Sequence, residues 1–116
     1  NPDAPTTSHT DAQTFIEKFD CIDGMLFDPP YSPRQISECY KGMGLKVGMK
    51  ETQNATLYAR VKNAAMPRIV AGGIVICCGW NSGGMGEKRG FELLEIMLVA
   101  HGGAHNDTIV TVERKK

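Results

Sequence analysis

Four consecutive residues, Asp28, Pro29, Pro30 and Tyr31, place a carboxylate, two prolines and an aromatic ring directly after a short apolar run. A carboxylate and a neighbouring backbone carbonyl can each accept a hydrogen bond from one amino group, and the tyrosine adds a flat ring. Successive prolines fix φ at about −65°, which holds the carbonyls in place. An Asp-Pro pair is also common in turns, so the four residues indicate either a binding site or a turn.

The residues before this motif predict a helix followed by a buried strand. Thr10 and Gln13 have the spacing of a capping box, and apolar residues recur on one helical face over residues 12–19. The apolar run over residues 21–27 predicts a buried strand, although an Asp-Gly pair inside it also fits a hairpin turn. In an open α/β sheet ligands bind beyond the carboxyl ends of the strands, which is where the motif would then lie.

The rest of the chain alternates between helical and strand patterns. Capping signals and apolar spacing predict helices over residues 33–43 and 57–65. Residues 74–79 and 107–116 predict strands, whereas residues 91–101 suit either a buried strand or a helix. Together these elements predict a single α/β domain over the whole chain, with a mostly parallel sheet.

Bulk composition narrows the class of protein. The chain has 116 residues, of which 41% are hydrophobic and 22% charged, which is typical of one soluble globular domain. Its formal net charge is zero, so any contact with a polyanion requires a local basic patch. No apolar stretch approaches the roughly 20 residues of a membrane span, and no signal peptide is visible. The four cysteines lack CxxC spacing, and the adjacent Cys77 and Cys78 lie inside an apolar run, which predicts reduced core thiols in a cytosolic protein.

The Asp28–Tyr31 motif resembles motif IV of the amino-group DNA methyltransferases, whose pattern is Asp-Pro-Pro-Tyr after a buried strand. The blocks that resemble a small group of phage and mobile-element adenine-specific DNA methylases are LFDPPYSPRQISECY, GGIVICCGWNSGG and GFELLEIMLVAHGGAHNDTIVTVERK. The resemblance covers most of the chain and is weakest over residues 44–68. It implies a Rossmann-like class I methyltransferase sheet, mostly parallel with a late antiparallel strand, in the cytoplasm of a bacterium or a phage-infected host.

The resemblance also implies an activity: transfer of a methyl group from S-adenosylmethionine to N6 of an adenine flipped out of DNA. Asp28 and the carbonyl of Pro29 would each accept one N–H bond of the amino group, which frees the nitrogen lone pair. Pro30 would help to hold the carbonyls, and Tyr31 would stack on the base. Methylation of cytosine N4 is the closest alternative, although that class more often begins the motif with serine.

The same resemblance assigns cofactor binding to Asp11, Ala12, Phe27 and Asp28. In the family an Asp-Ala pair that opens a helix contacts the adenine of the cofactor, whereas Asp11 could also serve only the helix N-terminus. Phe27 fits either a pocket wall or the core. The family's first strand and its motif I loop have no counterpart after Asn1, which predicts an N-terminally incomplete domain. The alternative function is therefore a non-catalytic structural or dimerising fragment, and a truncated sheet edge would favour homo-oligomers.

Several other signals carry less weight. GGMGEKRG lacks the spacing of a dinucleotide or phosphate loop. His101 and His105 are four residues apart, but the two glycines between them disfavour a helix, so no metal site is expected. Trp80 and Asn81 could line the rim of the active site. Some basic residues could touch phosphates, although solvated surface is their default role: Arg60, Lys62, Arg68 and the ERKK tail.

Overall fold

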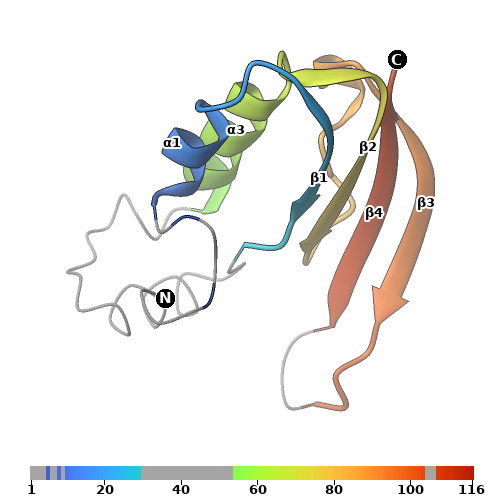
Figure 1. Cartoon of the computed structure of the whole chain (residues 1–116). Helices are drawn as coiled ribbons and strands as arrows, with labels where there is room; N and C mark the ends of the chain where they lie inside the picture. The colour runs from blue at the N-terminus through green and yellow to red at the C-terminus, as the bar shows by residue number, and fades with distance from the viewer. Residues whose placement is uncertain (1–4, 6–7, 9, 30–53, 104–106) are drawn as a thin grey trace.

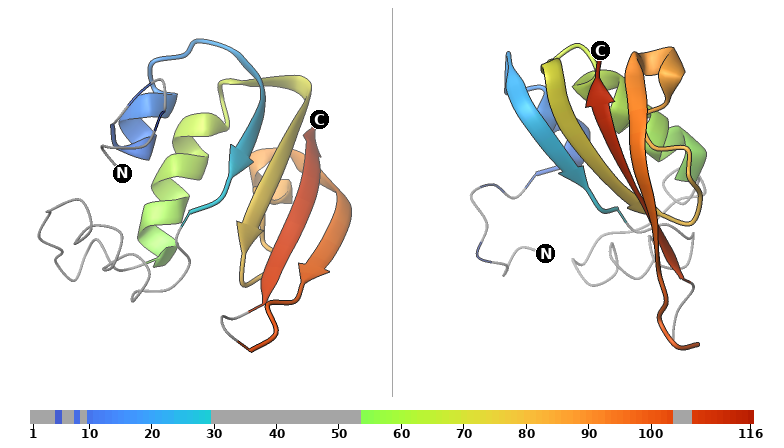
Figure 2. Two further views of the ribbon diagram at one scale, coloured as in Figure 1. Left: turned by 60° about the horizontal axis from the view of Figure 1, so that its bottom comes forward. Right: turned by 90° about the vertical axis from the view of Figure 1, so that its right-hand side faces the viewer.

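The computed structural model describes residues 5, 8, 10–29, 54–103 and 107–116. Both α-helices of this part lie on the same face of a sheet, as two directions of view show (Figure 1 and Figure 2). The elements in chain order are α1 (Ala12–Ile16), β1 (Ile22–Phe27), α3 (Asn54–Ala65), β2 (Ile69–Gly79), the 3₁₀ helix η1 (Glu87–Arg89), β3 (Phe91–Val99) and β4 (Thr108–Lys115).

The four described strands form one sheet in the order β1-β2-β4-β3. β1 and β2 are parallel, whereas β4 is antiparallel to both of its neighbours, β2 and β3. Three of the strands therefore run in one direction, and the last strand of the chain runs in the other. The prediction of a mostly parallel sheet is confirmed for the direction of the described strands. It is wrong for the hydrogen-bonded pairs, because β4 lies between β2 and β3 and is antiparallel to both, which leaves β1–β2 as the parallel pair among the described strands.

Helix α1 is shorter than the predicted span of residues 12–19 and begins differently. Its N-cap is Asp11, whose Oδ2 accepts hydrogen bonds from the backbone N of Thr14 at 3.0 Å and from Thr14 Oγ1 at 2.9 Å. The predicted capping box with Thr10 as N-cap is therefore wrong. An aspartate one residue later supplies the acceptor that the unpaired amides of the first turn need.

Helix α3 confirms the prediction of a helix over residues 57–65 and begins three residues earlier. Val61 and Ala65 are buried, because their spacing of four places both on the face turned to the sheet. Two cations bind the free carbonyls where the helix ends: Arg68 Nη1 donates to Ala64 O at 2.6 Å, and Lys115 Nζ donates to Met66 O at 2.5 Å. Lys115 thus ties the last strand to the helix end.

Strand β1 excludes the alternative of a hairpin turn at its Asp-Gly pair, since the pair lies inside the strand. The ladder with β2 is irregular at this point: Ile22 pairs with Ile69, whereas Gly24 pairs with Ile74. The extra residues of β2 form a bulge in which Gly72 has a φ of 82°. A side chain at Gly24 would come within 2.8 Å of the Ile74 carbonyl oxygen, so the close approach of the strands requires glycine.

The core lies between the sheet and α3 and is completed by the connection between β2 and β3. Because β2 and β3 point the same way, this connection must cross over the sheet, and it does so as a loop with one turn of 3₁₀ helix. Met85 of the loop and Phe91 at the start of β3 are buried at 1% and 0% exposure. The buried apolar residues are Ile16, Val61, Ala65, Ile69, Val75, Cys77, Met85 and Phe91. None of the helices in the described ranges could span a membrane.

Candidate functional site

The first two residues of the Asp28–Tyr31 motif lie at the carboxyl edge of the sheet. Phe27 is the last residue of β1, and it pairs with Cys77 of the parallel strand β2. Asp28 follows and is exposed to solvent. No residue in the described ranges donates a hydrogen bond to its carboxylate, so Asp28 is neither turned into the core nor used as a helix cap there. Pro29 is half-buried beside it.

Asp28 is close enough to the neighbouring strand to influence it electrostatically. Burial raises the pKa of the Cys78 thiol, and the negative charge of Asp28 raises it further. The predicted pair Pro30 and Tyr31, and the helix predicted over residues 33–43, lie outside the described residues.

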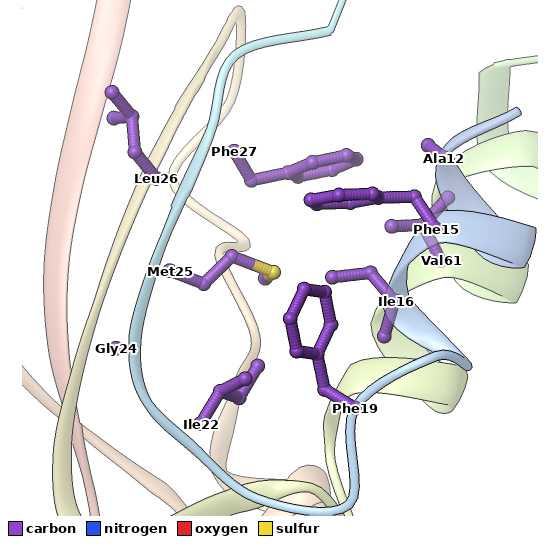
Figure 3. Close-up of a pocket in the computed structure, with 10 residues that line it drawn as sticks. All are labelled: Ala12, Phe15, Ile16, Phe19, Ile22, Gly24, Met25, Leu26, Phe27 and Val61. Atoms are coloured by element: carbon purple, nitrogen blue, oxygen red, sulfur yellow. The ribbon is translucent and has the colours of Figure 1, made fainter. Parts of the chain in front are cut away.

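An apolar hollow of about 360 Å³ lies between α1 and β1, next to Asp28 in the chain. Side chains from α1 and from β1 point toward one another across it, with the rings of Phe15 and Phe27 together at one end (Figure 3). Its lining residues are Ala12, Phe15, Ile16, Phe19, Ile22, Gly24, Met25, Leu26, Phe27 and Val61. The structure therefore brings Ala12 and Phe27, two of the predicted cofactor residues, to one cavity.

The ring of Phe27 also meets a residue that the sequence analysis did not select. Tyr58 of α3 packs edge-on against it, with ring centroids 5.8 Å apart and an interplanar angle of 85°. Tyr58 lies three residues before Val61, so helical spacing placed it on the buried face and could have identified it. Phe27 is thus held from the helix side while it borders the hollow.

Asp11 has a structural role in α1, as its two bonds to Thr14 show. Both bonds use Oδ2, and Asp11 precedes Ala12 of the hollow directly. The helix-cap interpretation of Asp11 is confirmed, and its contact with a cofactor stays a prediction.

The loop that follows β2 is fixed from two sides. The carboxylate of Glu113, itself 2% exposed, accepts hydrogen bonds from Met85 N at 2.6 Å and from Gly86 N at 2.9 Å. Lys62 Nζ of α3 donates to Gly84 O at 2.6 Å. Burial lowers the pKa of Lys62, whereas the nearby Glu113 charge acts in the opposite direction.

Similarity of the chain to known proteins is found among solved structures. No protein-family profile and no curated protein matches it. Among solved structures, TrmN from Thermus thermophilus superposes with a TM-score of 0.60 at 20% identity, over 94% of this chain and 28% of TrmN. Two structures of a candidate DNA modification methylase from the same species superpose with TM-scores of 0.55 and 0.56 at 16% and 15% identity. They cover 90% and 91% of this chain, and 50% and 52% of the methylase.

The chain has a methyltransferase-like fold. It spans between about a quarter and a half of the length of these structural neighbours, so it corresponds to part of their fold. At these identities the comparison concerns the fold and not the residues of the site.

Within this methyltransferase-like fold, several basic residues expected at the surface have internal partners. Lys62 binds the Gly84 carbonyl, and Arg68 Nε binds Phe19 O at 2.9 Å in addition to its contact with α3. In the tail, Lys115 binds two carbonyls. Solvated surface is therefore the wrong interpretation for these three residues. Their side chains donate hydrogen bonds to backbone carbonyls of other segments and so connect those segments.

The hairpin between β3 and β4 accounts for one of the two histidines. His101 Nε2 lies 2.7 Å from Thr108 Oγ1, and the His101 backbone N donates to Asp107 Oδ1 at 3.2 Å. His105 lies outside the described residues. In the described ranges no cluster of three potential metal-binding side chains occurs.

Proposed function

We propose that the carboxyl edge of β1 is a methyl-transfer site, and that this chain forms the catalytic region of a DNA methyltransferase that uses S-adenosylmethionine and modifies adenine N6. The observation that carries the proposal is the position of Asp28. Its exposed carboxylate lies beyond the end of a parallel strand and directly follows Phe27, which together with Ala12 lines an apolar hollow. Ligands of open α/β sheets bind at this edge.

The hollow is chemically suited to the cofactor. Its apolar and aromatic walls fit the flat adenine ring of S-adenosylmethionine. The described bonds of Asp11 use Oδ2, which leaves Oδ1 to accept a hydrogen bond from the amino group of that ring. When bound, S-adenosylmethionine supplies an electrophilic methyl group on a sulfonium centre.

The residues of the motif would act on the amino group of the target base. Its nitrogen shares the lone pair with the ring, which makes it a weak nucleophile. The Asp28 carboxylate and the Pro29 carbonyl accept one N–H bond each, and so draw the nitrogen toward tetrahedral geometry. The base must leave the duplex to reach them, and Tyr31 would stack on it there.

The strand arrangement supports the class I, Rossmann-like assignment. Three strands run in one direction and the last strand is inserted in the opposite direction between β2 and β3. A late antiparallel strand is what the sequence resemblance implies. The structural neighbours support a methyltransferase-like fold, and the DNA modification methylase among them is consistent with DNA as the substrate.

Strand β3 favours a second candidate, a structural or dimerising module. Its side chains Ile96, Met97 and Leu98 are 52%, 51% and 64% exposed, and it pairs with β4 alone among the described strands. An apolar edge strand of this kind is a surface for association with another chain. Light scattering would measure the mass in solution, and Leu98→Lys should lower it if β3 forms the contact.

Methyl transfer from labelled S-adenosylmethionine to oligonucleotides tests the catalytic proposal. The substrates would contain adenine, N6-methyladenine in its place, or cytosine as the sole amino-bearing base. We expect the native chain to label the adenine oligonucleotide, and Asp28→Ala to lower the rate by roughly 100-fold or more, as for loss of a group that stabilises developing charge. Asp23→Ala is the matched control, since Asp23 is an exposed carboxylate of β1, the strand that Asp28 follows.

The outcomes separate the candidates. Loss of label with Asp28→Ala but not with Asp23→Ala supports the proposal. Label on cytosine assigns N4 methylation in place of N6. Absence of label on every oligonucleotide contradicts catalysis by this chain and supports the structural module.

A further inference from the structure

Trp80 is the only tryptophan of the chain, and it is 42% exposed. It directly follows β2, just as Asp28 directly follows β1. Because these two strands are parallel neighbours in register, with Phe27 opposite Cys77, both residues leave the sheet at the same edge. A large exposed aromatic residue thus follows the strand next to the candidate catalytic carboxylate.

The loop that begins at Trp80 is rigidly built. Asn81 Oδ1 accepts a hydrogen bond from Gly83 N at 2.9 Å, which closes a tight turn behind the tryptophan. Lys62 and Glu113 then bind three consecutive residues, Gly84, Met85 and Gly86, through their backbone groups. A bound loop of this kind presents its first residue in a defined position.

The way the loop is held is costly for stability alone. Glu113 is buried, and burial also removes solvent from Lys62, which lowers the pKa of Lys62. Replacing a buried ionic group by a well-packed apolar one is often neutral or stabilising. A buried carboxylate that binds two loop amides gives something that apolar packing does not, which is a fixed path for the backbone.

We propose that Trp80 is a stacking platform for a nucleobase of the substrate strand, and that Glu113 and Lys62 are positioning residues that hold it beside Asp28. The inference rests on the function proposed above for that edge of the sheet. An indole ring stacks on any base, so the platform would bind a flipped or single-stranded base without reading its identity. Asp28 and Pro29 would select the amino group, and Trp80 would supply affinity.

The single tryptophan makes the proposal directly measurable. Titration with a short single-stranded oligonucleotide of adenines should quench Trp80 fluorescence, whereas an abasic strand of equal length and charge should not. By anisotropy of a labelled oligonucleotide, Trp80→Ala should weaken binding roughly 5- to 150-fold, the range measured for one base–aromatic stack. Trp80→Phe keeps a ring and should restore most of the affinity.

Glu113→Gln tests positioning, because one of the two carboxylate oxygens becomes an amide that cannot accept from a loop N–H. We expect weaker oligonucleotide binding and faster depolarisation of Trp80 fluorescence, with the exposed Glu95→Gln as matched control. Combining Trp80→Ala with Glu113→Gln should weaken binding no further than Trp80→Ala alone, since both act through one ring. Additive effects would contradict the positioning role.

These measurements are independent of catalysis. Asp28→Ala should abolish methyl transfer while Trp80 quenching by the adenine strand persists, which would support the platform. Equal quenching by adenine and abasic strands, or unchanged affinity of Trp80→Ala, would overturn the platform even if methyl transfer is observed. Quenching without methyl transfer by the native chain would leave the platform intact and refute the catalytic proposal.

Discussion

Strands β2 and β3 are both rich in large apolar residues, yet these side chains are largely buried on β2 at its centre and largely exposed on β3. On β2, Val75 and Cys77 are 0% and 6% exposed. On β3, only Phe91 is buried, and Leu98 is 64% exposed. Hydrophobicity alone does not distinguish the two strands. The spacing of apolar residues over 91–101 did not decide whether that segment is a strand or a helix.

Position in the sheet and cover on one face account for the difference. β2 pairs on both sides, and α3 packs over it. Among the described strands β3 pairs only with β4. The crossing connection is a loop and not a longer helix, so it covers β3 only at its beginning, near Phe91. Stability is therefore concentrated where the loop, α3 and the centre of the sheet meet, and β3 contributes mainly through its first residue.

The largest effect should come from truncation of the one buried residue of β3. Phe91→Ala removes a fully buried ring and should lower the free energy of unfolding by about 3–5 kcal/mol. Leu98→Ala on the same strand should lower it by only about 0.5 kcal/mol, because the side chain is already mostly in water. Urea unfolding of both variants measures the two values.

Equal losses in the free energy of unfolding for Phe91→Ala and Leu98→Ala would contradict the difference in burial between the two side chains. A large loss for Leu98→Ala would mean that this side chain is buried in solution, as it would be in a dimer formed through β3. Repeating the unfolding at several protein concentrations distinguishes this case, since the stability of a dimer depends on concentration.

The next largest effect should appear where the crossing loop meets Glu113. Gly84 has a φ of 50°, and a side chain there would collide with the Glu113 carboxylate. Gly84→Ala should therefore displace the carboxylate from the amides of Met85 and Gly86 and cost roughly 3 kcal/mol. Gly90→Ala is the matched control: its φ is 87° with open space around it, so only the backbone penalty of about 1 kcal/mol applies.

Calorimetric melting of the two alanine variants gives this difference. A Gly84 variant no less stable than the Gly90 variant would show that Glu113 can move without loss. The crossing loop would then not be a fixed part of the core.

Local patterns in the sequence predicted most elements of the described fold and the position of Asp28 at the end of a strand. The burial predicted for that strand is wrong over the described residues, because none of the side chains of β1 is buried. The apolar run around Cys77 and Cys78 also predicted that both lie in the core; Cys77 is buried, whereas Cys78 is only half-buried. These features depend on residues close together in the chain, such as the apolar run of β1 and the spacing of Val61 and Ala65. The contribution of Ala12 and Phe27 to one hollow followed only from the family resemblance.

What the sequence did not reveal depends on partners far apart in the chain. In the sequence Glu113 belongs to a charged tail. In the structure it pairs with the buried Val75 of β2, so its side chain lies on the covered face of the sheet, under the loop. Lys62 reads as a surface cation, and its partner is 22 residues away. The capping box was assigned to Thr10 for a local reason, because Thr10 offers an equivalent acceptor one residue before Asp11 and the pattern alone does not choose between them.

The smallest predicted effect concerns the thiol at the centre of β2. Burial raises the pKa of Cys77 from 9.0 to about 11. Above pH 9 the unfolded chain therefore releases a proton that the folded chain keeps, so the free energy of unfolding falls as pH rises from 9 toward 11. Between pH 8 and pH 10 the loss should be roughly 1.4 kcal/mol.

Lys62 acts against this trend. Its pKa in the folded chain is lowered from 10.5, so unfolding takes up a proton at high pH and stability rises with pH until that uptake ends. The pKa of Cys78 on the same strand is also raised, so a Cys77→Ala/Cys78→Ala variant is needed to isolate Lys62. In urea unfolding of this double variant the decline should disappear and leave only the rise due to Lys62. A decline that persists in it would assign the pH dependence to groups outside β2. The centre of the sheet would then be more accessible to solvent than the burial of Val75 and Cys77 indicates. The difference in side-chain burial between β2 and β3 would be correspondingly smaller.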